Sequence, residues 1–145
     1  MRTEPDLLEL DQQVCFALAV ASRNVVALYR PILEPLGLTH PQYLVMLALW
    51  GTSPLTVTEL GRRLSLEPAT LSPLLKRLEA VGLLTRERRP SDQRALEVAL
   101  TPRGRALRQQ ALDVPPQVIE RLGMSVPELQ SLHAALTRVI AATTS

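Results

Sequence analysis

Residues 56–101, TVTELGRRLSLEPATLSPLLKRLEAVGLLTRERRPSDQRALEVALT, decide the fold. Thr56 or Thr58 is suited to cap a short helix, because a threonine hydroxyl accepts a hydrogen bond from a free N–H of the first turn. The segment Ser65-Leu66-Glu67 then forms a turn. A second helix opens with Pro68 and ends near Gly82, because proline suits a first turn and glycine suits the left-handed position after a helix. The stretch therefore predicts two short helices joined by a tight turn.

A β-hairpin is predicted directly after the second helix. Residues 83–88 and 95–100 show partial alternation of apolar and polar side chains, and the segment 89–92 between them is rich in turn formers. Two helices, a tight turn and a basic hairpin in this order make a winged helix-turn-helix, whose second helix enters the major groove of DNA. The leading hypothesis is therefore a protein that binds duplex DNA.

The segment before residue 56 predicts two more helices. Residues 41–50 form a short helix, with Thr39 or His40 as its cap and Pro41 in its first turn. A longer N-terminal helix is indicated by apolar residues at spacings of three and four, namely Leu7, Leu10, Val14, Leu18, Ala21, Val25, Leu28 and Ile32.

The segment after residue 101 predicts a long helix that starts at Pro102, reaches Leu122 and is kinked at Pro115-Pro116. A last helix follows Ser125, which has the spacing of a capping box. The expected fold is mainly α: a winged helix-turn-helix with long N- and C-terminal dimerisation helices and one β-hairpin wing.

The terminal helices carry more apolar surface than a small winged domain can cover. We expect residues of about 1–36 and 102–145 to pair two copies of the chain and residues of about 41–101 to bind DNA, all within one domain. A two-fold homodimer presents its recognition helices to successive major grooves, roughly 34–36 Å apart, so an inverted-repeat operator is expected. The alternative is that the terminal helices pack only on their own domain.

The distribution of charge favours nucleic acid as the partner. Between Arg62 and Arg108 the chain has eleven basic and five acidic residues, which gives +6, whereas the remaining five basic and nine acidic residues give −4. Phosphate neutralisation requires such a concentration of positive charge on one module.

Candidate DNA contacts lie on the second helix of the motif. Thr70 and Ser72 suit base edges or phosphates, Arg77 is long enough for a bidentate contact with guanine, and Lys76 suits a phosphate. Pro73 lacks the amide hydrogen that helix geometry requires and is expected to bend the helix.

Further candidates lie on the hairpin. Arg94 is expected to enter the minor groove, with the Asp92 carboxylate orienting its guanidinium; the alternative is an exposed salt bridge within the loop. Arg86 and Arg88 complete the predicted set of DNA-binding residues.

Composition argues against other classes. The single cysteine excludes an intrachain disulfide, and with two distant histidines it leaves no recognisable metal cluster. No convergent catalytic set or phosphate-binding glycine loop is visible, so neither an enzyme nor a cofactor is expected. No apolar run reaches the about 18 residues that span a bilayer, so we expect a cytoplasmic protein without a membrane partner.

The chain resembles the MarR family of bacterial transcription regulators over nearly its whole length. The hairpin signature of that family is visible as Asp92-Gln93-Arg94 followed by residues 98–101, VALT. A narrower resemblance, to the organic-hydroperoxide regulators (OhrR), is carried by residues 10–16, LDQQVCF, by 38–44, LTHPQYL, and by 70–79, TLSPLLKRLE. That subgroup also has a proline in its recognition helix.

The OhrR resemblance implies that Cys15 is a peroxide sensor in a repressor. Its thiolate attacks an organic hydroperoxide and becomes a sulfenic acid, which passes to a mixed disulfide with a small thiol or to over-oxidation, and the oxidised dimer leaves its operator. The subgroup surrounds the sulfur with tyrosine hydroxyls, some from the partner subunit. Tyr29 matches one of them, whereas His40 and Ala19 stand where tyrosines are usual; His40 is able to donate to a thiolate and Ala19 is not.

Two readings of Cys15 remain open from the residues themselves. A lone helical cysteine is also typical of an inert structural position. In that case the protein is a MarR-type regulator that responds to a small aromatic or lipophilic ligand between the dimerisation helices and the winged part.

Overall fold

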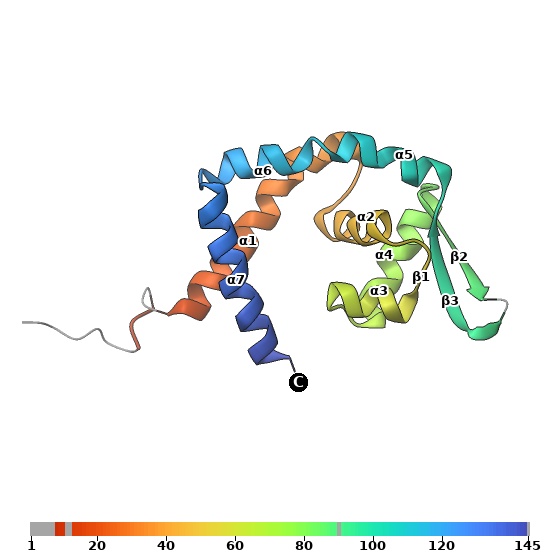
Figure 1. Cartoon of the computed structure of the whole chain (residues 1–145), viewed down its shortest axis with the longest axis horizontal. Helices are drawn as coiled ribbons and strands as arrows, with labels where there is room; N and C mark the ends of the chain where they lie inside the picture. The colour runs from red at the N-terminus through yellow and green to blue at the C-terminus, as the bar shows by residue number, and fades with distance from the viewer. Residues whose placement is uncertain (1–7, 11–12, 90, 145) are drawn as a thin grey trace, which may run out of the picture.

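The computed structural model describes residues 8–10, 13–89 and 91–144, with only the backbone described at residues 92–94. Its helices and strands appear in Figure 1. In chain order they are α1 (Val14–Leu33), η2 (Glu34–Leu36), α2 (His40–Gly51), β1 (Leu55–Thr56), α3 (Val57–Leu64), α4 (Pro68–Ala80), β2 (Leu84–Arg89), β3 (Asp92–Leu100), α5 (Pro102–Ala111), α6 (Val114–Leu122) and α7 (Val126–Thr143).

Hydroxyl residues fix where several helices begin. The Thr101 side chain accepts from the Gly104 N–H at the start of α5. Three other helices begin with complete capping boxes, in which each side chain of the pair bonds the other residue's backbone N–H. These pairs are Thr39 with Gln42, Thr56 with Glu59, and Ser125 with Glu128. The predicted starts of these helices are confirmed.

The sheet is antiparallel and has the strand order β1-β3-β2. The predicted hairpin is confirmed as β2 and β3, in which Leu84 pairs with Leu100 and Arg86 with Val98. The sequence analysis predicted no strand at β1. A strand of two residues is too short to show an alternation of apolar and polar side chains. Leu55 is a strand residue only because it pairs with Val98 across the sheet.

One core joins the sheet to α2, α3 and α4. Its fully buried large side chains come from every one of these elements and from the end of α1, among them Leu33, Met46, Leu49, Leu60, Leu71, Leu75, Leu78, Leu84 and Val98. The winged helix-turn-helix predicted from residues 56–101 therefore folds as one packed unit, with α2 as its third helix.

Two helix boundaries differ from the prediction. The first helix begins at Val14, so Leu10 of the predicted stripe lies outside it and the stripe from Val14 to Ile32 lies within it; Leu7 falls outside the described residues. The predicted kinked helix after Pro102 is two helices, α5 and α6, separated at Leu112 and Asp113. Prolines suit the first turn of a helix, so Pro115 lies in the first turn of α6, which begins at Val114, and does not kink a longer helix.

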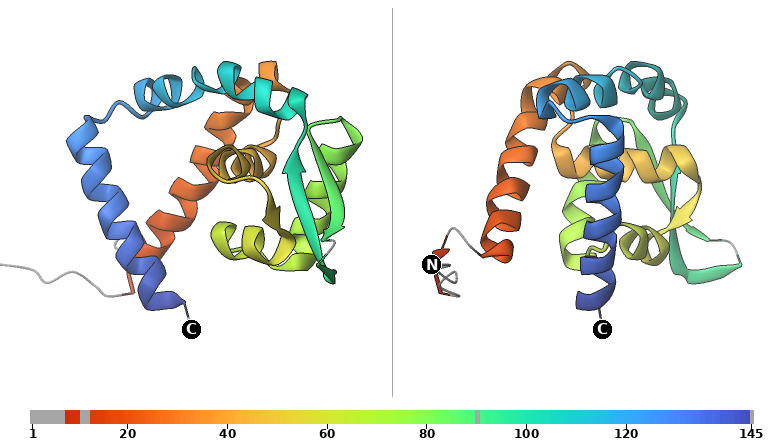
Figure 2. Two further views of the ribbon diagram at one scale, coloured as in Figure 1. Left: turned by 45° about the vertical axis from the view of Figure 1, so that its right-hand side comes forward. Right: turned by 60° about the vertical axis from the view of Figure 1, so that its left-hand side comes forward.

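The terminal helices leave most of their surface uncovered within one chain. Helix α6 packs on α1, and α7 turns away from α6 (Figures 1 and 2). Only Ile32 and Leu33 are buried in α1, and no residue of α7 is buried. Segment Val14–Leu36 is long and apolar enough to cross a membrane by length and composition, although it is not the uninterrupted apolar run that the sequence analysis looked for. The segment contains charged side chains. Its mean hydropathy remains high in spite of them, but they interrupt any continuous apolar run.

Candidate nucleic-acid interface and thiol site

Helix α4 presents a polar face to solvent. Its buried face consists of Leu71, Leu75 and Leu78, which pack into the core. The helical period then places the remaining positions outward, and the five residues predicted on this helix are all exposed, namely Thr70, Ser72, Pro73, Lys76 and Arg77. The structure thus brings these five candidates together on one surface.

Pro73 lies inside α4, and the helix continues through it from Pro68 to Ala80. Proline has no N–H, so the carbonyl of Ala69 lacks its usual partner four residues on. Both residues are exposed, which leaves that carbonyl on the solvent side of the helix.

The hairpin candidates fall into different environments. Arg88 is exposed, whereas the Arg86 guanidinium is held by Glu79 at 3.0 Å and its side chain is 23% exposed. Asp92 and Arg94 belong to β3 by their backbone, but their side chains lie outside the described residues. Their pairing and their role at the hairpin tip stay predictions.

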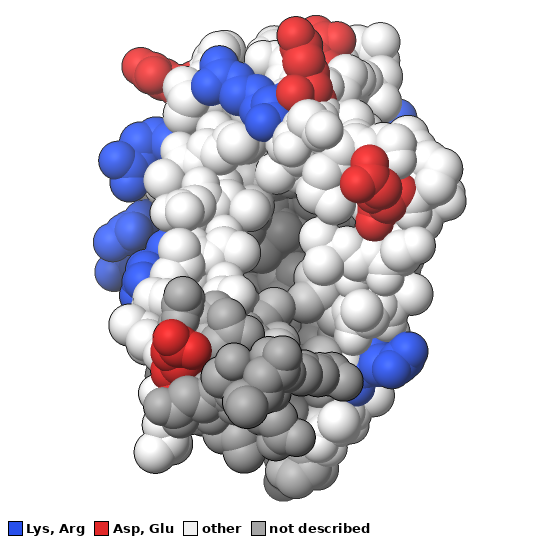
Figure 3. All heavy atoms as spheres, turned by 90° about the vertical axis from the view of Figure 1, so that its left-hand side faces the viewer, with Lys and Arg blue, Asp and Glu red and all other residues white. Residues whose placement is uncertain are grey.

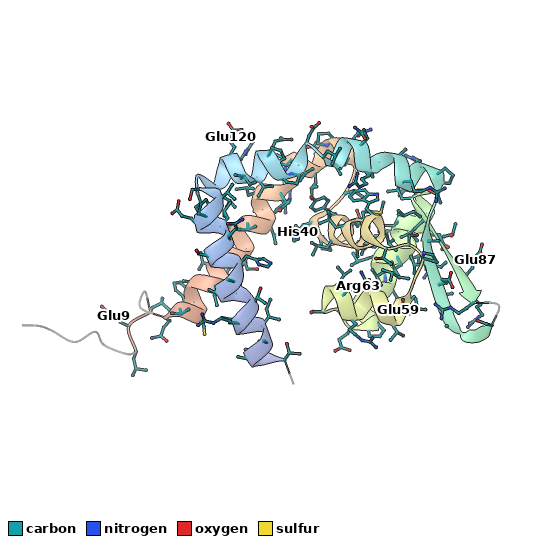
Figure 4. All side chains as sticks on the ribbon, in the orientation of Figure 1. Glu9, His40, Glu59, Arg63, Glu87 and Glu120 are labelled. Carbon is teal, nitrogen blue, oxygen red and sulfur yellow. The ribbon has the colours of Figure 1, made fainter. Side chains whose placement is uncertain are left out.

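The outer face of the hairpin is not suited to a phosphate backbone. Glu87 and Glu97 stand opposite each other in the register of β2 and β3. Glu87 points away from the body of the protein (Figure 4). Two carboxylates opposite each other repel, and Arg89 relieves this by bonding the Glu97 carboxylate at 3.1 Å. DNA is expected to approach from the α4 side of the hairpin.

Two cations of α3 add to the charge near α4. Arg62 and Arg63 occupy the last turn of α3, where positive charge suits the helix dipole, and both are exposed. The Arg63 guanidinium donates to the Thr52 hydroxyl at 3.3 Å. The sequence analysis counted both arginines in the basic segment but did not name them among the DNA-binding candidates.

The other candidate site is a cluster of rings where α1 and α2 meet. The ring of Tyr29 lies 4.8 Å from that of His40 and 5.8 Å from that of Tyr43, measured between ring centroids. Burial raises the pKa of both tyrosines and lowers the pKa of His40, because each ring is partly removed from water. His40 is therefore neutral at pH 7. Sequence reasoning missed Tyr43, whose only signal was its position three residues after His40.

Cys15 is exposed and lies at the opposite end of α1 from this cluster. Fourteen residues separate it from Tyr29, which corresponds to about 21 Å along a helix with a rise of 1.5 Å per residue. The structure therefore does not bring Cys15 together with Tyr29 and His40 within one chain. Among the described residues, no group of three His, Cys, Asp or Glu side chains is placed to hold a metal ion.

A cavity of about 280 Å³ lies between α2 and the α5–α6 segment. Its walls are aromatic and aliphatic with one cation, and they consist of Tyr43, Leu47, Trp50, Gly51, Arg108, Ala111, Leu112 and Pro115. Apolar walls with one charged group are the usual features of a site for a small amphipathic molecule.

Comparison with known proteins identifies the family. The model of the MarR family matches residues 38–96. The chain is 39% identical to the organic hydroperoxide resistance transcriptional regulator of Bacillus subtilis over 94% of this chain and 92% of that protein. It is 36% identical to the regulator MgrA of Staphylococcus aureus over 93% and 92% of the two chains.

A solved structure of a protein bound to DNA is also similar to this chain. Overoxidized AbfR bound to DNA superimposes with a TM-score of 0.75 at 35% identity, over 93% of this chain and 95% of that one. The mainly helical winged fold predicted from the sequence is confirmed by this likeness. The chain belongs to the MarR family of DNA-binding transcriptional regulators, which are not enzymes.

Proposed function

We propose that two copies of this chain bind an inverted-repeat operator in duplex DNA and repress transcription from it. The observation that carries the proposal is the exposed polar face of α4 beside a basic hairpin, on a module with a charge of +6 between Arg62 and Arg108. Polar side chains at the start of a groove helix read base edges, and the surrounding cations bind phosphates.

Pairing of two chains is supported by the uncovered terminal helices. Val126, Leu132, Val139 and Ile140 of α7 are each at least 42% exposed, an unusual state for large apolar side chains that recur on one helix. Among the residues that the structure describes, the face that α1 and α7 line is mostly uncharged, with a hollow along its middle and charged side chains towards its margins (Figure 3). A second copy covers this face, while residues of about 41–101 remain free to bind DNA.

The apolar length of α1 has the same explanation. Its uncovered side chains pack against the partner, so the segment that passes a test for membrane spanning lies in a protein interface. We place the protein in the cytoplasm, where a regulator has access to DNA, without a membrane partner.

We further propose that an organic hydroperoxide releases the dimer from DNA by oxidising Cys15. Cys15 and Tyr29 lie on roughly the same side of α1, because fourteen residues at 100° each come within about 40° of a whole number of turns. If α1 packs antiparallel to α1 of the partner, the cysteine end of one helix lies beside the Tyr29–His40 end of the other. The sensor is then completed only in the dimer.

The chemistry at this site requires the thiolate form of Cys15. The sulfur attacks one peroxide oxygen, the O–O bond breaks, and the remaining alkoxide leaves as an alcohol after taking up a proton. Sulfur is oxidised to a sulfenic acid and the peroxide is reduced. A small thiol then displaces water from the sulfenic acid to give a mixed disulfide, because the chain has no second cysteine.

The surroundings of the sulfur differ from the usual set in the subgroup. Ala19 offers no hydroxyl, and neutral His40 donates one N–H in place of a tyrosine O–H. Tyr29 keeps its proton at neutral pH, since burial raises its pKa, and so it remains a donor to a sulfur anion.

The experiment compares wild type with Cys15→Ser in a gel-shift assay on the protein's own promoter fragment, with and without cumene hydroperoxide and a small thiol. Both proteins bind DNA before treatment, and only the wild type is released. Mass spectrometry of the same samples then detects a mixed disulfide or a higher oxide on Cys15. Release of the serine variant by hydroperoxide would assign sensing to another group.

A second candidate function is regulation by a small amphipathic ligand, with Cys15 in a structural role. The cavity of about 280 Å³ between α2 and α5 favours this candidate. Trp50, the single tryptophan of the chain, lines that cavity, so its fluorescence reports a bound ligand directly. A ligand that shifts this emission and releases DNA from Cys15→Ser would support this candidate over oxidation.

A further inference from the structure

The contact between Glu79 and Arg86 joins the recognition helix to the hairpin. Glu79 lies in the last turn of α4, and three residues separate the end of this helix from β2. One carboxylate oxygen accepts from the Arg86 Nε at 3.3 Å and from Nη2 at 3.0 Å. The other oxygen accepts from the Arg86 backbone N–H at 3.1 Å. A single side chain of α4 therefore holds both the backbone and the guanidinium of one β2 residue.

The position of this contact on the hairpin is informative. The buried side chains among the described residues of β2 and β3 are Leu84, Val98 and Leu100, all at the end nearest the core. Arg86 pairs with Val98, so Glu79 bonds the hairpin at the level where its buried part ends. Beyond this level the hairpin projects toward its tip.

The hydrogen bond from the Arg86 backbone N–H also satisfies a donor at the edge of the sheet. Strand β2 is at the edge of the sheet, so its outward N–H groups have no neighbouring strand to accept them. Glu79 accepts from one of these groups, which fixes the distance between α4 and the edge of the hairpin. A second ion pair among the described residues of the hairpin, Arg89 with Glu97, joins its two strands to each other and does not reach α4.

The same contact argues against a direct role of Arg86 in DNA binding. Its charge is neutralised by Glu79, and three of its N–H bonds already point at one carboxylate. Consistent with this, the hydrogen bonds from Arg86 lower the pKa of Glu79, so the pair is ionised at neutral pH. The phosphate contact predicted from the sequence would require Arg86 to leave this partner.

We propose that Glu79 and Arg86 are positioning residues for operator binding: the pair sets the angle between recognition helix and wing so that both reach the DNA together. The proposal rests on the proposed DNA-binding function. It assigns no DNA contact to either residue. When the pair is broken, α4 still enters the major groove, but the wing loses its fixed place over the neighbouring backbone and minor groove.

The test compares Glu79→Gln with Glu87→Gln in the full-length dimer. Both variants remove one negative charge, but Glu87 lies on the outer, exposed face of the same hairpin. We expect Glu79→Gln to bind the operator about tenfold more weakly, the loss typical of one set of wing contacts, and Glu87→Gln to bind no more weakly than wild type. The salt dependence of Glu79→Gln should also flatten by about 0.9 in log–log slope for each phosphate that the wing no longer neutralises.

A double-mutant cycle with Arg86→Gln separates positioning from direct contact. If the pair acts as a unit, Arg86→Gln has little further effect once Glu79 is changed. Footprinting distinguishes this role from general destabilisation. In Glu79→Gln, protection of the DNA should be lost at the flanks under the wings and kept at the centres of the half-sites. If Glu79→Gln binds as tightly as or more tightly than Glu87→Gln, or if the two losses simply add, Arg86 is a phosphate contact and the proposal is overturned.

A measurement without DNA keeps this proposal distinct from the proposed function. Hydrogen exchange of the Arg86 backbone amide should be faster in Glu79→Gln than in Glu87→Gln, because a neutral amide oxygen is a weaker acceptor than the Glu79 carboxylate that it replaces. Equal exchange rates in the two variants would overturn the positioning role. Failure of wild type to bind any promoter DNA would instead refute the function on which the proposal rests.

Discussion

Gly104 is the position where the smallest change should have the largest effect on stability. It lies buried in the first turn of α5, and an added Cβ would overlap the carbonyl oxygen of Leu83 and lie 3.2 Å from Leu100 Cδ2. The Gly104 carbonyl also accepts from Trp50 Nε1 at 2.9 Å, which ties α2 to α5. Gly104→Ala therefore has to push α5 away from the winged unit.

The expected magnitude follows from three effects. Overpacking of this kind costs about 1–3 kcal/mol. Loss of the Trp50 hydrogen bond adds about 1 kcal/mol. The better helix propensity of alanine returns at most about 1 kcal/mol, and less in a first turn. We expect Gly104→Ala to lower the free energy of unfolding by about 2 kcal/mol.

The assay is urea unfolding followed by the fluorescence of Trp50, the single tryptophan, whose indole makes the affected hydrogen bond. Gly51→Ala is the matched control, because Gly51 is also helical but has no atom within 4 Å of an added Cβ. The control should unfold within about 1 kcal/mol of wild type. If Gly104→Ala is as stable as Gly51→Ala and its Trp50 emission is unchanged, the close packing of α5 on Leu83 is refuted.

Two further predictions concern binding and pH. Arg94→Ala should weaken operator binding by about 5- to 150-fold without changing the unfolding midpoint, because the sequence predicts that Arg94 contacts DNA and does not pack in the core; unchanged affinity at moderate salt would remove the wing tip from the interface. His40→Gln should reduce the loss of stability on acidification. Burial lowers the pKa of His40, so its neutral form stabilises the fold above the unfolded value near 6.5, and this contribution is lost as pH falls below it. Unfolding curves of the two proteins at pH 7 and 5 check this, and parallel losses would contradict it.

The winged unit was predictable from the sequence because its signals are local. Caps such as Thr56 act within one turn, the leucines of α4 repeat at the helical period, and Gly82 marks the helix end with φ of 81°. Each of these constraints involves residues close in the chain, so no knowledge of packing is needed to see them.

The features that sequence reasoning missed depend on partners distant in the chain or in space. β1 exists because Leu55 pairs with Val98, and Tyr43 joins the ring cluster because α1 folds back against α2. The sequence analysis also missed Glu79 as the partner of Arg86, because this partner is seen only when α4 is placed beside the hairpin. The break between α5 and α6 likewise depends on where α6 packs on α1.

Sedimentation equilibrium of the protein, alone and with a promoter duplex of known mass, tests the central claim most directly. The account predicts a free species with the mass of two 16.0 kDa chains and a complex that contains two chains per inverted repeat. A protein that stays at 16.0 kDa at micromolar concentration, or a complex with one chain per duplex, would contradict it.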